Sequence, residues 1–163
     1  MTKTADICDA HKDVQVCHCQ FLTLGSIRSF SGRIRTVRCE QDIVLVKKVL
    51  SENGAGCVLV VDGGGSLARA IFGDNMALLA IDHGWAGVVI NGAVRDSAEI
   101  DAMDIGVKVL GLIPMRPERS GRGEADVPLR FGDADFEPGR WLVADEDGVI
   151  LLPPRMSGVP HLE

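Results

Sequence analysis

The sequence has no tyrosine, and aromatic residues make up only 4% of its 163 positions. It also lacks an uninterrupted apolar run of the roughly 20 residues that a membrane span needs, which argues against a membrane partner. Apolar residues nevertheless make up 46% of the chain, enough for a sizeable core. Because apolar runs separate the nineteen glycines, these indicate tight turns rather than disorder. We therefore expect one domain spanning residues 1–163.

Clusters of positive charge are also missing. Seventeen lysines and arginines oppose 23 acidic residues, which gives a net charge of −6. Binding to a phosphate backbone requires clustered cations, so nucleic acid is not expected as a direct partner. The five cysteines are odd in number, and the opening residues MTKTADICDAHKD show no basic-then-apolar signal pattern. These features predict a reducing, cytoplasmic setting.

Two short motifs lack the partners that their best-known chemistry requires. In CHC at 17–19, a strand would place both thiols on one face and His18 on the other, a poor arrangement for one metal ion. Buried thiols packing as small apolar groups are the better interpretation. VVDGGGS is not followed by Gly-Lys-Ser/Thr and lacks the third glycine of a dinucleotide fingerprint, so we do not expect a phosphate loop here. It indicates a turn where the backbone closely approaches a ligand or a neighbouring strand.

The remaining pattern alternates strands with helices. It predicts a helix capped by Asp42 and ended by Gly54, a short helix LARAIF capped by Ser66, a helix from Asp74 to Gly84, and one from Ser97 to about Met103. Expected strands are 32–39, 57–62, 86–92 and 107–114, followed by an antiparallel meander of 127–131, 139–145 and 148–153. The fold class is therefore α/β, a β/α/β core with a C-terminal antiparallel meander. Residues 1–12 and 154–163 look weakly ordered.

A charged loop, MRPERSGRGEAD at 115–126, separates the core from the meander. Its three arginines are offset by three acidic residues. Two interpretations stay open: a solvated connector, or the rim of a site for an anion.

The most informative positions are Asp74 and Asp96, which begin two expected helices, and Arg95, which precedes the second. They could be two helix caps and a surface cation. Alternatively, small ligands bind beyond the carboxyl ends of strands in α/β sheets, where helix N-termini offer N–H groups to an anion. Arg95 would then clamp a carboxylate, and Asp96 would supply a hard oxygen ligand for Mg²⁺ or Mn²⁺. Together these groups would hold a metal-chelated 2-oxo acid.

The run VLVVDGGGSLARAIFGDNMALLAIDHGWAGVVINGAVRDS resembles the RraA family, the regulators of ribonuclease E activity, which are related to class II 4-hydroxy-4-methyl-2-oxoglutarate aldolases. The resemblance extends over a core of about 7–153. Its most specific element is Asp74, twenty intervening residues, then Arg95 and Asp96. The resemblance implies a single swivelling β/β/α domain assembled as a homotrimer, with sites between subunits.

Carried over by position, Gly73, Asp74, Asn75 and Met76 would surround the substrate, and Arg95 would bind its carboxylate or oxo group. Arg95 and Asp74 would be catalytic, and Asp96 would hold the divalent metal, partly through waters. One departure is Ile43, where an asparagine is common in the family.

The implied activity is a divalent-metal-dependent lyase on pyruvate-containing acids, either oxaloacetate decarboxylation or aldol cleavage of 4-hydroxy-4-methyl-2-oxoglutarate. The alternative is a non-catalytic regulator that binds ribonuclease E or its associated helicases. Some members are also labelled menaquinone-pathway methyltransferases. We do not find the expected methyl-donor site, a glycine loop with an acidic residue ending the following strand.

Overall fold

A computed structural model describes residues 1–162. A nine-stranded mixed sheet runs in the order β1-β11-β10-β3-β4-β5-β6-β2, with β7 paired to β3, and β8 and β9 form a separate two-stranded sheet. The helices are α1 (Thr4–Ala10), α2 (Val44–Leu50), α3 (Asp74–Asp82) and α4 (Ser97–Asp101). The strands are β1 (Gln15–Val16), β2 (Leu22–Leu24), β3 (Phe30–Cys39), β4 (Val58–Asp62), β5 (Gly87–Val94), β6 (Val107–Leu112), β7 (Gly123–Ala125), β8 (Leu129–Phe131), β9 (Ala134–Phe136), β10 (Trp141–Asp145) and β11 (Gly148–Leu151).

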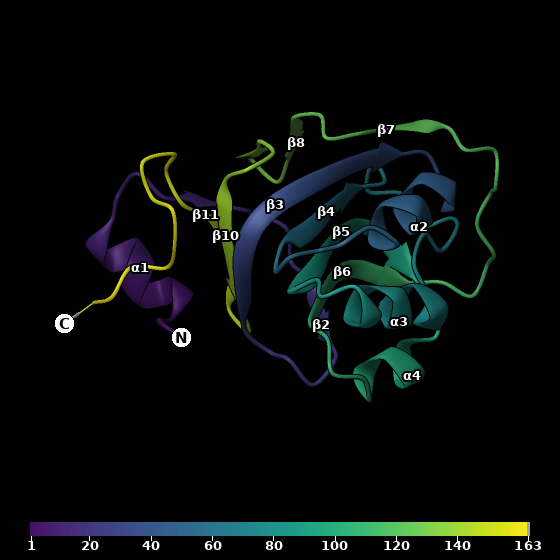
Figure 1. The fold of residues 1–163 in the computed structure, drawn as a ribbon, viewed down its shortest axis with the longest axis horizontal. Coiled ribbons are helices and arrows are strands. Elements are labelled where there is room, and N and C mark those ends of the chain that lie inside the picture. Colours follow the sequence, from purple (N-terminus) through teal and green to yellow (C-terminus); the bar gives the residue numbers. More distant parts are fainter. Residues whose placement is uncertain (163) are drawn as a thin grey trace.

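Strands β3, β4, β5 and β6 form the parallel centre of the sheet, in chain order. Helices α2, α3 and α4 connect them and lie together on one side (Figure 1). All eight residues of β5 are buried, which explains its nearly continuous apolar sequence. Alternate residues of β4 point to two cores: Leu59 and Val61 pack with the helices, while Val58 and Val60 pack against β8–β11. The structure confirms the α/β fold class.

Strand β3 joins the two halves of the curled sheet. Its first residues pair antiparallel with β10, and the rest pair in parallel with β4. At Gly32, within the stretch that pairs with β10, an added Cβ would lie only 2.3 Å from the Gly56 carbonyl oxygen. The close approach therefore requires glycine at this position. The expected meander consists of two hairpins, β8–β9 and β10–β11, in different sheets.

The short helix expected at LARAIF is absent, and this prediction is wrong. Residues 67–72 run as an irregular and partly extended segment whose end lies beside β5. The Ile71 N–H donates to the Ala93 carbonyl, and the Arg95 N–H donates to the Phe72 carbonyl. Because Ile71 and Phe72 are also buried in the main core, pairing and burial override the local helix preference.

Two predicted boundaries also differ. The helix after Asp42 ends at Leu50, with Ser51 as its C-cap, rather than at Gly54. Gly54 instead lies against the Trp85 ring, where an added Cβ would lie 2.6 Å from the nearest ring atom. The N-terminus, expected to be weakly ordered, forms α1. Its first residue, Thr4, donates from its backbone N–H and its hydroxyl to the Asp145 carboxylate, each at 2.8 Å. Within residues 1–162, no helix is long and apolar enough to cross a membrane.

Candidate functional site

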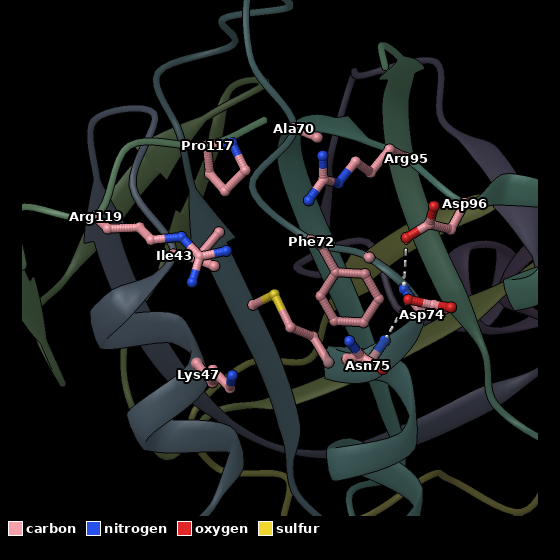
Figure 2. A pocket seen from close by; sticks show the side chains of 12 residues that line it. Ile43, Lys47, Ala70, Phe72, Asp74, Asn75, Arg95, Asp96, Pro117 and Arg119 are labelled. Atoms are coloured by element: carbon pink, nitrogen blue, oxygen red, sulfur yellow. Dashed lines mark hydrogen bonds between the residues drawn. The ribbon is translucent and has the colours of Figure 1, made fainter. Parts of the chain in front are cut away.

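A cavity of about 430 Å³, including its opening to solvent, lies where β5 ends and α3 begins. Helix α2 and the loop after β6 form its other side (Figure 2). All six residues that the sequence analysis assigned to the site line this cavity. The complete lining is Ile43, Lys47, Ala70, Phe72, Gly73, Asp74, Asn75, Met76, Arg95, Asp96, Pro117 and Arg119.

Asp96 connects the two halves of the sequence motif. It precedes α4 in a left-handed conformation, with φ of 61°, and its side chain does not cap that helix. Instead, its Oδ2 accepts a hydrogen bond from the Asp74 N–H at 3.2 Å, at the start of α3 (Figure 2). Of the two interpretations of Asp96, the helix cap is therefore wrong, because the side chain crosses to a different helix. A carboxylate at this helix N-terminus is electrostatically favourable.

Gly73 leaves the space that this contact needs. A Cβ built on Gly73 would lie 2.8 Å from Asp96 Oδ2, so a larger residue would displace the carboxylate. Asp74 is the first residue of α3, and its Oδ1 accepts a hydrogen bond from the Asn75 N–H at 2.8 Å. Gly73, not Asp74, is the N-cap of α3, and no side chain caps the helix, so the interpretation of Asp74 as the cap is wrong. Its side chain stays beside its own first turn and also lines the cavity.

Arg95 is half-buried, and its backbone is fixed by the hydrogen bond from its N–H to the Phe72 carbonyl at 3.1 Å. Its guanidinium makes no hydrogen bond or ion pair with any residue in the described range 1–162, although two carboxylates line the same cavity. The fork of N–H donors is thus available to an external carboxylate or oxo group.

Lys47 and Arg119 are site residues that sequence reasoning did not assign. Lys47 comes from α2, and Arg119 comes from the charged loop at 115–126. The position of Arg119 in the cavity lining supports the interpretation that this loop forms the rim of a site for an anion. With Arg95, three cations line the cavity against two carboxylates. The arginines of the loop were visible in the sequence, whereas nothing local in α2 distinguishes Lys47 from Lys48.

Asp42 connects the start of α2 to the charged loop at 115–126. Its Oδ1 accepts the Val44 N–H at 2.9 Å, as expected of a helix cap. Its Oδ2 accepts three hydrogen bonds from the loop, from the Ser120 N–H at 2.6 Å, the Ser120 hydroxyl at 2.7 Å and the Gly121 N–H at 3.0 Å. Burial raises the pKa of Asp42, but these hydrogen bonds lower it by more, so the pKa lies below its usual value.

The cysteines lie outside this cavity. Burial raises the pKa of Cys17 and of Cys39 to about 12, so both remain neutral thiols near pH 7. His18 points to Asp133, with 3.1 Å between Nδ1 and Oδ2. Across residues 1–162, no three His, Cys, Asp or Glu side chains are grouped so that they could hold a metal ion. A metal at the cavity would thus take most of its ligands from water and substrate.

The family model described as RraA-like, Aldolase/RraA, matches residues 4–151. The chain belongs to the RraA-like family. It is 46% identical over 157 residues to a 4-hydroxy-4-methyl-2-oxoglutarate aldolase of Thermus thermophilus, covering 96% of each chain.

Two solved structures share this fold. The RNA-processing inhibitor RraA from Thermus thermophilus superimposes with a TM-score of 0.92 at 45% identity, over 98% of this chain and 97% of that one. A Geobacillus kaustophilus protein described as an S-adenosylmethionine:2-dimethylmenaquinone methyltransferase has a TM-score of 0.90 at 48% identity, over 92% and 94%. Similar relatives thus carry three different functional names, so the chemistry has to be argued from the cavity.

Proposed function

We propose that this protein is a divalent-metal-dependent carbon–carbon lyase that acts on pyruvate-containing acids. The observation that carries the proposal is the adjacency of Arg95 and Asp96 in one cavity, where the guanidinium has no protein partner within residues 1–162. A cation fork beside a carboxylate suits a 2-oxo acid that is bound together with a metal ion. The similarity to an aldolase at 46% identity supports the same class of reaction.

The donor set fits Mg²⁺ or Mn²⁺. Asp96 offers a half-buried hard oxygen, and Asp74 places a second carboxylate in the same cavity. Mg²⁺ usually binds through one or two carboxylates and keeps several waters, so a cluster of three protein ligands is not required. When bound, a divalent ion would supply Lewis-acid polarisation of the substrate oxygens.

The residues of the chain would act on the 2-oxo acid end of the substrate. Arg95 would bind the carboxylate and the oxo group, and its fixed charge would stabilise the negative charge that develops on the oxo oxygen as the C3–C4 bond breaks. Oxaloacetate would yield CO₂ and pyruvate after protonation at C3. In 4-hydroxy-4-methyl-2-oxoglutarate the C4 hydroxyl must also lose a proton, and Asp74 would orient a water that accepts it.

Pyruvate release by the purified protein tests this proposal. Oxaloacetate and 4-hydroxy-4-methyl-2-oxoglutarate are supplied with Mg²⁺, with Mn²⁺, or with excess chelator. We expect pyruvate release above the rate of a protein-free control with the same metal only in the presence of a divalent ion, with this activity recovered when the ion is added back after chelation. Full activity in excess chelator, or no release from either acid, would refute the proposal.

The similarity to an RNA-processing inhibitor at 45% identity favours one second candidate, a homotrimer that binds ribonuclease E or an associated helicase. A net charge of −6 suits contact with basic segments of such partners. Asp96→Ala separates the two candidates, since it removes the proposed metal ligand and little buried surface. Lyase activity should collapse while the trimer mass and any ribonuclease E binding persist. Lost partner binding with unchanged oxaloacetate turnover would favour the regulator instead.

A further inference from the structure

Two cysteines outside the candidate cavity lie beside each other. Cys17 and Cys19 both pack in the apolar core between the central sheet and strands β8–β11, and this core shares no described residue with the cavity lining. Both sulfurs also contact the turn between β8 and β9. A Cβ added at Gly132 would lie 2.7 Å from the Cys17 Sγ and 2.9 Å from the Cys19 Sγ. Because one point lies this near to both sulfurs, the two thiols are neighbours.

Backbone hydrogen bonds fix the segment that carries the pair. The Cys17 N–H donates to the Val149 carbonyl at 2.9 Å, and the His18 N–H donates to the Gly132 carbonyl at 2.8 Å. His18 is exposed, and its Nδ1 lies 3.1 Å from an oxygen of Asp133. The two thiols therefore point inward and the imidazole points outward, so the alternation predicted from the sequence is confirmed. The imidazole does not separate the two sulfurs.

From this arrangement we infer that Cys17 and Cys19 form a site of reversible oxidation, at which hydrogen peroxide converts the two thiols into an intramolecular disulfide. The inference is independent of the proposed lyase function. The other cysteines are arranged differently. Cys39 ends β3 and Cys57 precedes β4, so they lie at opposite ends of this parallel pair of strands. Cys8 belongs to α1 and packs in a separate cluster.

The difference in burial between the two thiols sets the order of the steps. Cys17 is only 5% exposed, whereas Cys19 is partly accessible to solvent. Burial raises the pKa of Cys17 to about 12, and contact with the Cys19 side chain adds to this shift. Cys17 therefore stays a neutral thiol near pH 7. Because the thiolate is the nucleophile, Cys19 is the residue that reacts first with peroxide.

The oxidation proceeds in two balanced steps. The Cys19 thiolate attacks one oxygen of hydrogen peroxide, the O–O bond breaks, and a sulfenic acid and hydroxide are formed. The Cys17 thiol then attacks the sulfenic sulfur and the S–O bond breaks, so that the hydroxyl group leaves as water with the Cys17 proton. The hydroxide takes up the proton that the Cys19 thiol released. The two sulfurs thus lose two electrons, and the peroxide is reduced to two molecules of water.

The resulting disulfide should be easily reduced. It would close a loop of residues 17–19 only, which restrains the unfolded chain far less than a long loop does. Cys19 is also accessible to an attacking thiol, and exposed or strained disulfides are the more readily reduced ones. Reduced glutathione should therefore regenerate both thiols. This behaviour is typical of a redox-sensing pair and not of a structural disulfide.

Mass spectrometry of the whole chain after peroxide treatment tests this inference. Both cysteines fall in one tryptic peptide, residues 13–28, because no lysine or arginine lies between Lys12 and Arg28. Peroxide is removed, and the remaining thiols are alkylated in denaturant. We expect this peptide to carry no alkyl group and to be lighter by two hydrogen atoms, and glutathione added before alkylation should restore double alkylation. Double alkylation without glutathione, or sulfinic acids in place of a disulfide, would overturn the inference.

Single variants test the order of the two thiols. In Cys17→Ser, oxidation should stop at a Cys19 sulfenic acid, which dimedone traps. In Cys19→Ser, trapping at Cys17 should be at least about tenfold lower, since a neutral thiol is a poor nucleophile. Cys57→Ser is the matched control, because Cys57 is also partly buried but lies outside the pair, and it should leave the disulfide yield unchanged. Equal trapping in the first two variants, or loss of the disulfide in Cys57→Ser, would contradict the assignment.

Discussion

The carboxylate of Asp96 accepts a hydrogen bond from the backbone N–H of Asp74, with 3.2 Å between Oδ2 and N. The contact joins the second residue after β5 to the first turn of α3, 22 positions earlier in the chain. It satisfies one of the N–H groups that a helix start leaves unpaired. Asp96 thus combines a structural role at α3 with the proposed role of metal ligand, and its substitution has to be designed to separate them.

Asp96→Asn makes this separation. The amide oxygen can still accept the Asp74 N–H, while the negative charge is lost. We expect kcat/KM for oxaloacetate with Mg²⁺ to fall by at least about a hundredfold, since loss of a ligand removes the proposed Lewis acid. The free energy of unfolding should change by less than about 1 kcal/mol, the usual value of a helix cap. Kinetics and thermal melting, with the exposed Glu99→Gln as control, check both. Normal kinetics in Asp96→Asn would remove Asp96 from the metal site.

Gly73→Ala tests the geometry of the same contact. The backbone of Gly73 is extended, with φ of −154°, so alanine is not strained there. The added Cβ would nevertheless lie 2.8 Å from Asp96 Oδ2 and push the carboxylate aside. Because a 1 Å misplacement can cost about a hundredfold in rate, we expect a loss of that order in kcat/KM. Gly158→Ala, where a Cβ meets nothing within 4 Å, should leave the kinetics unchanged. Equal kinetics in both variants would contradict this account.

The proximity of Asp74 and Asp96 was predictable, because the order of strands and helices along the chain fixes which of their ends meet in a parallel sheet. Residue 96 follows β5 and residue 74 begins the helix that precedes it, so both lie at the carboxyl end of the sheet. Lys47 was not predictable in this way. Its place in the cavity depends on how α2 packs against the loop after β6, which Asp42 fixes over 78 residues of sequence. From the sequence, Asp42 looked only like the cap of its own helix.

In the fold as well, elements that depend on local sequence were predicted correctly, whereas a segment that depends on pairing with a distant residue was not. The buried strands β4 and β5 were readable as apolar runs, and α3 was readable from its start at Asp74 and its end before Gly84, which has φ of +73°. The segment 67–72 was wrongly predicted to be a helix, because Ala70 and Ile71 are compatible with a helical pattern as well as with an extended one. Only the pairing of this segment with Ala93, after the chain has turned, decides between them.

Arg95→Lys tests whether the guanidinium acts as a two-point clamp. Lysine keeps the charge but loses the fork of donors, so a bidentate contact to the carboxylate and oxo group cannot form. We expect a loss of about 2–4 kcal/mol in transition-state stabilisation, the range for removing a preorganised charge-stabilising donor. The free energy of unfolding should change by less than about 0.5 kcal/mol, because the half-buried guanidinium makes no hydrogen bond or ion pair within residues 1–162 that lysine would remove. Measured kcat/KM for oxaloacetate beside a melting curve decides the matter, with Arg122→Lys as control. Near-normal kinetics would make Arg95 a surface cation.

The Asp42 carboxylate should make the stability of the protein depend on pH in a defined direction, and Asp42→Asn should remove this dependence. Although burial raises the pKa of Asp42, its hydrogen bonds to Ser120, Val44 and Gly121 lower it below the unfolded value of about 3.9. A lowered carboxyl pKa stabilises the fold above the unfolded pKa, and this stabilisation is lost as pH falls through the folded pKa.

The unaltered protein should therefore be more stable than Asp42→Asn by about 1–3 kcal/mol at neutral pH, the range for a hydrogen-bonded charged group. The difference should stay constant down to about pH 4 and shrink below it, as the carboxylate becomes protonated. Denaturant unfolding of both proteins across this range measures the difference. Glu40→Gln, two residues away and exposed, is the control. A difference in stability that does not vary with pH would show that the Asp42 charge does not hold the loop at 115–126.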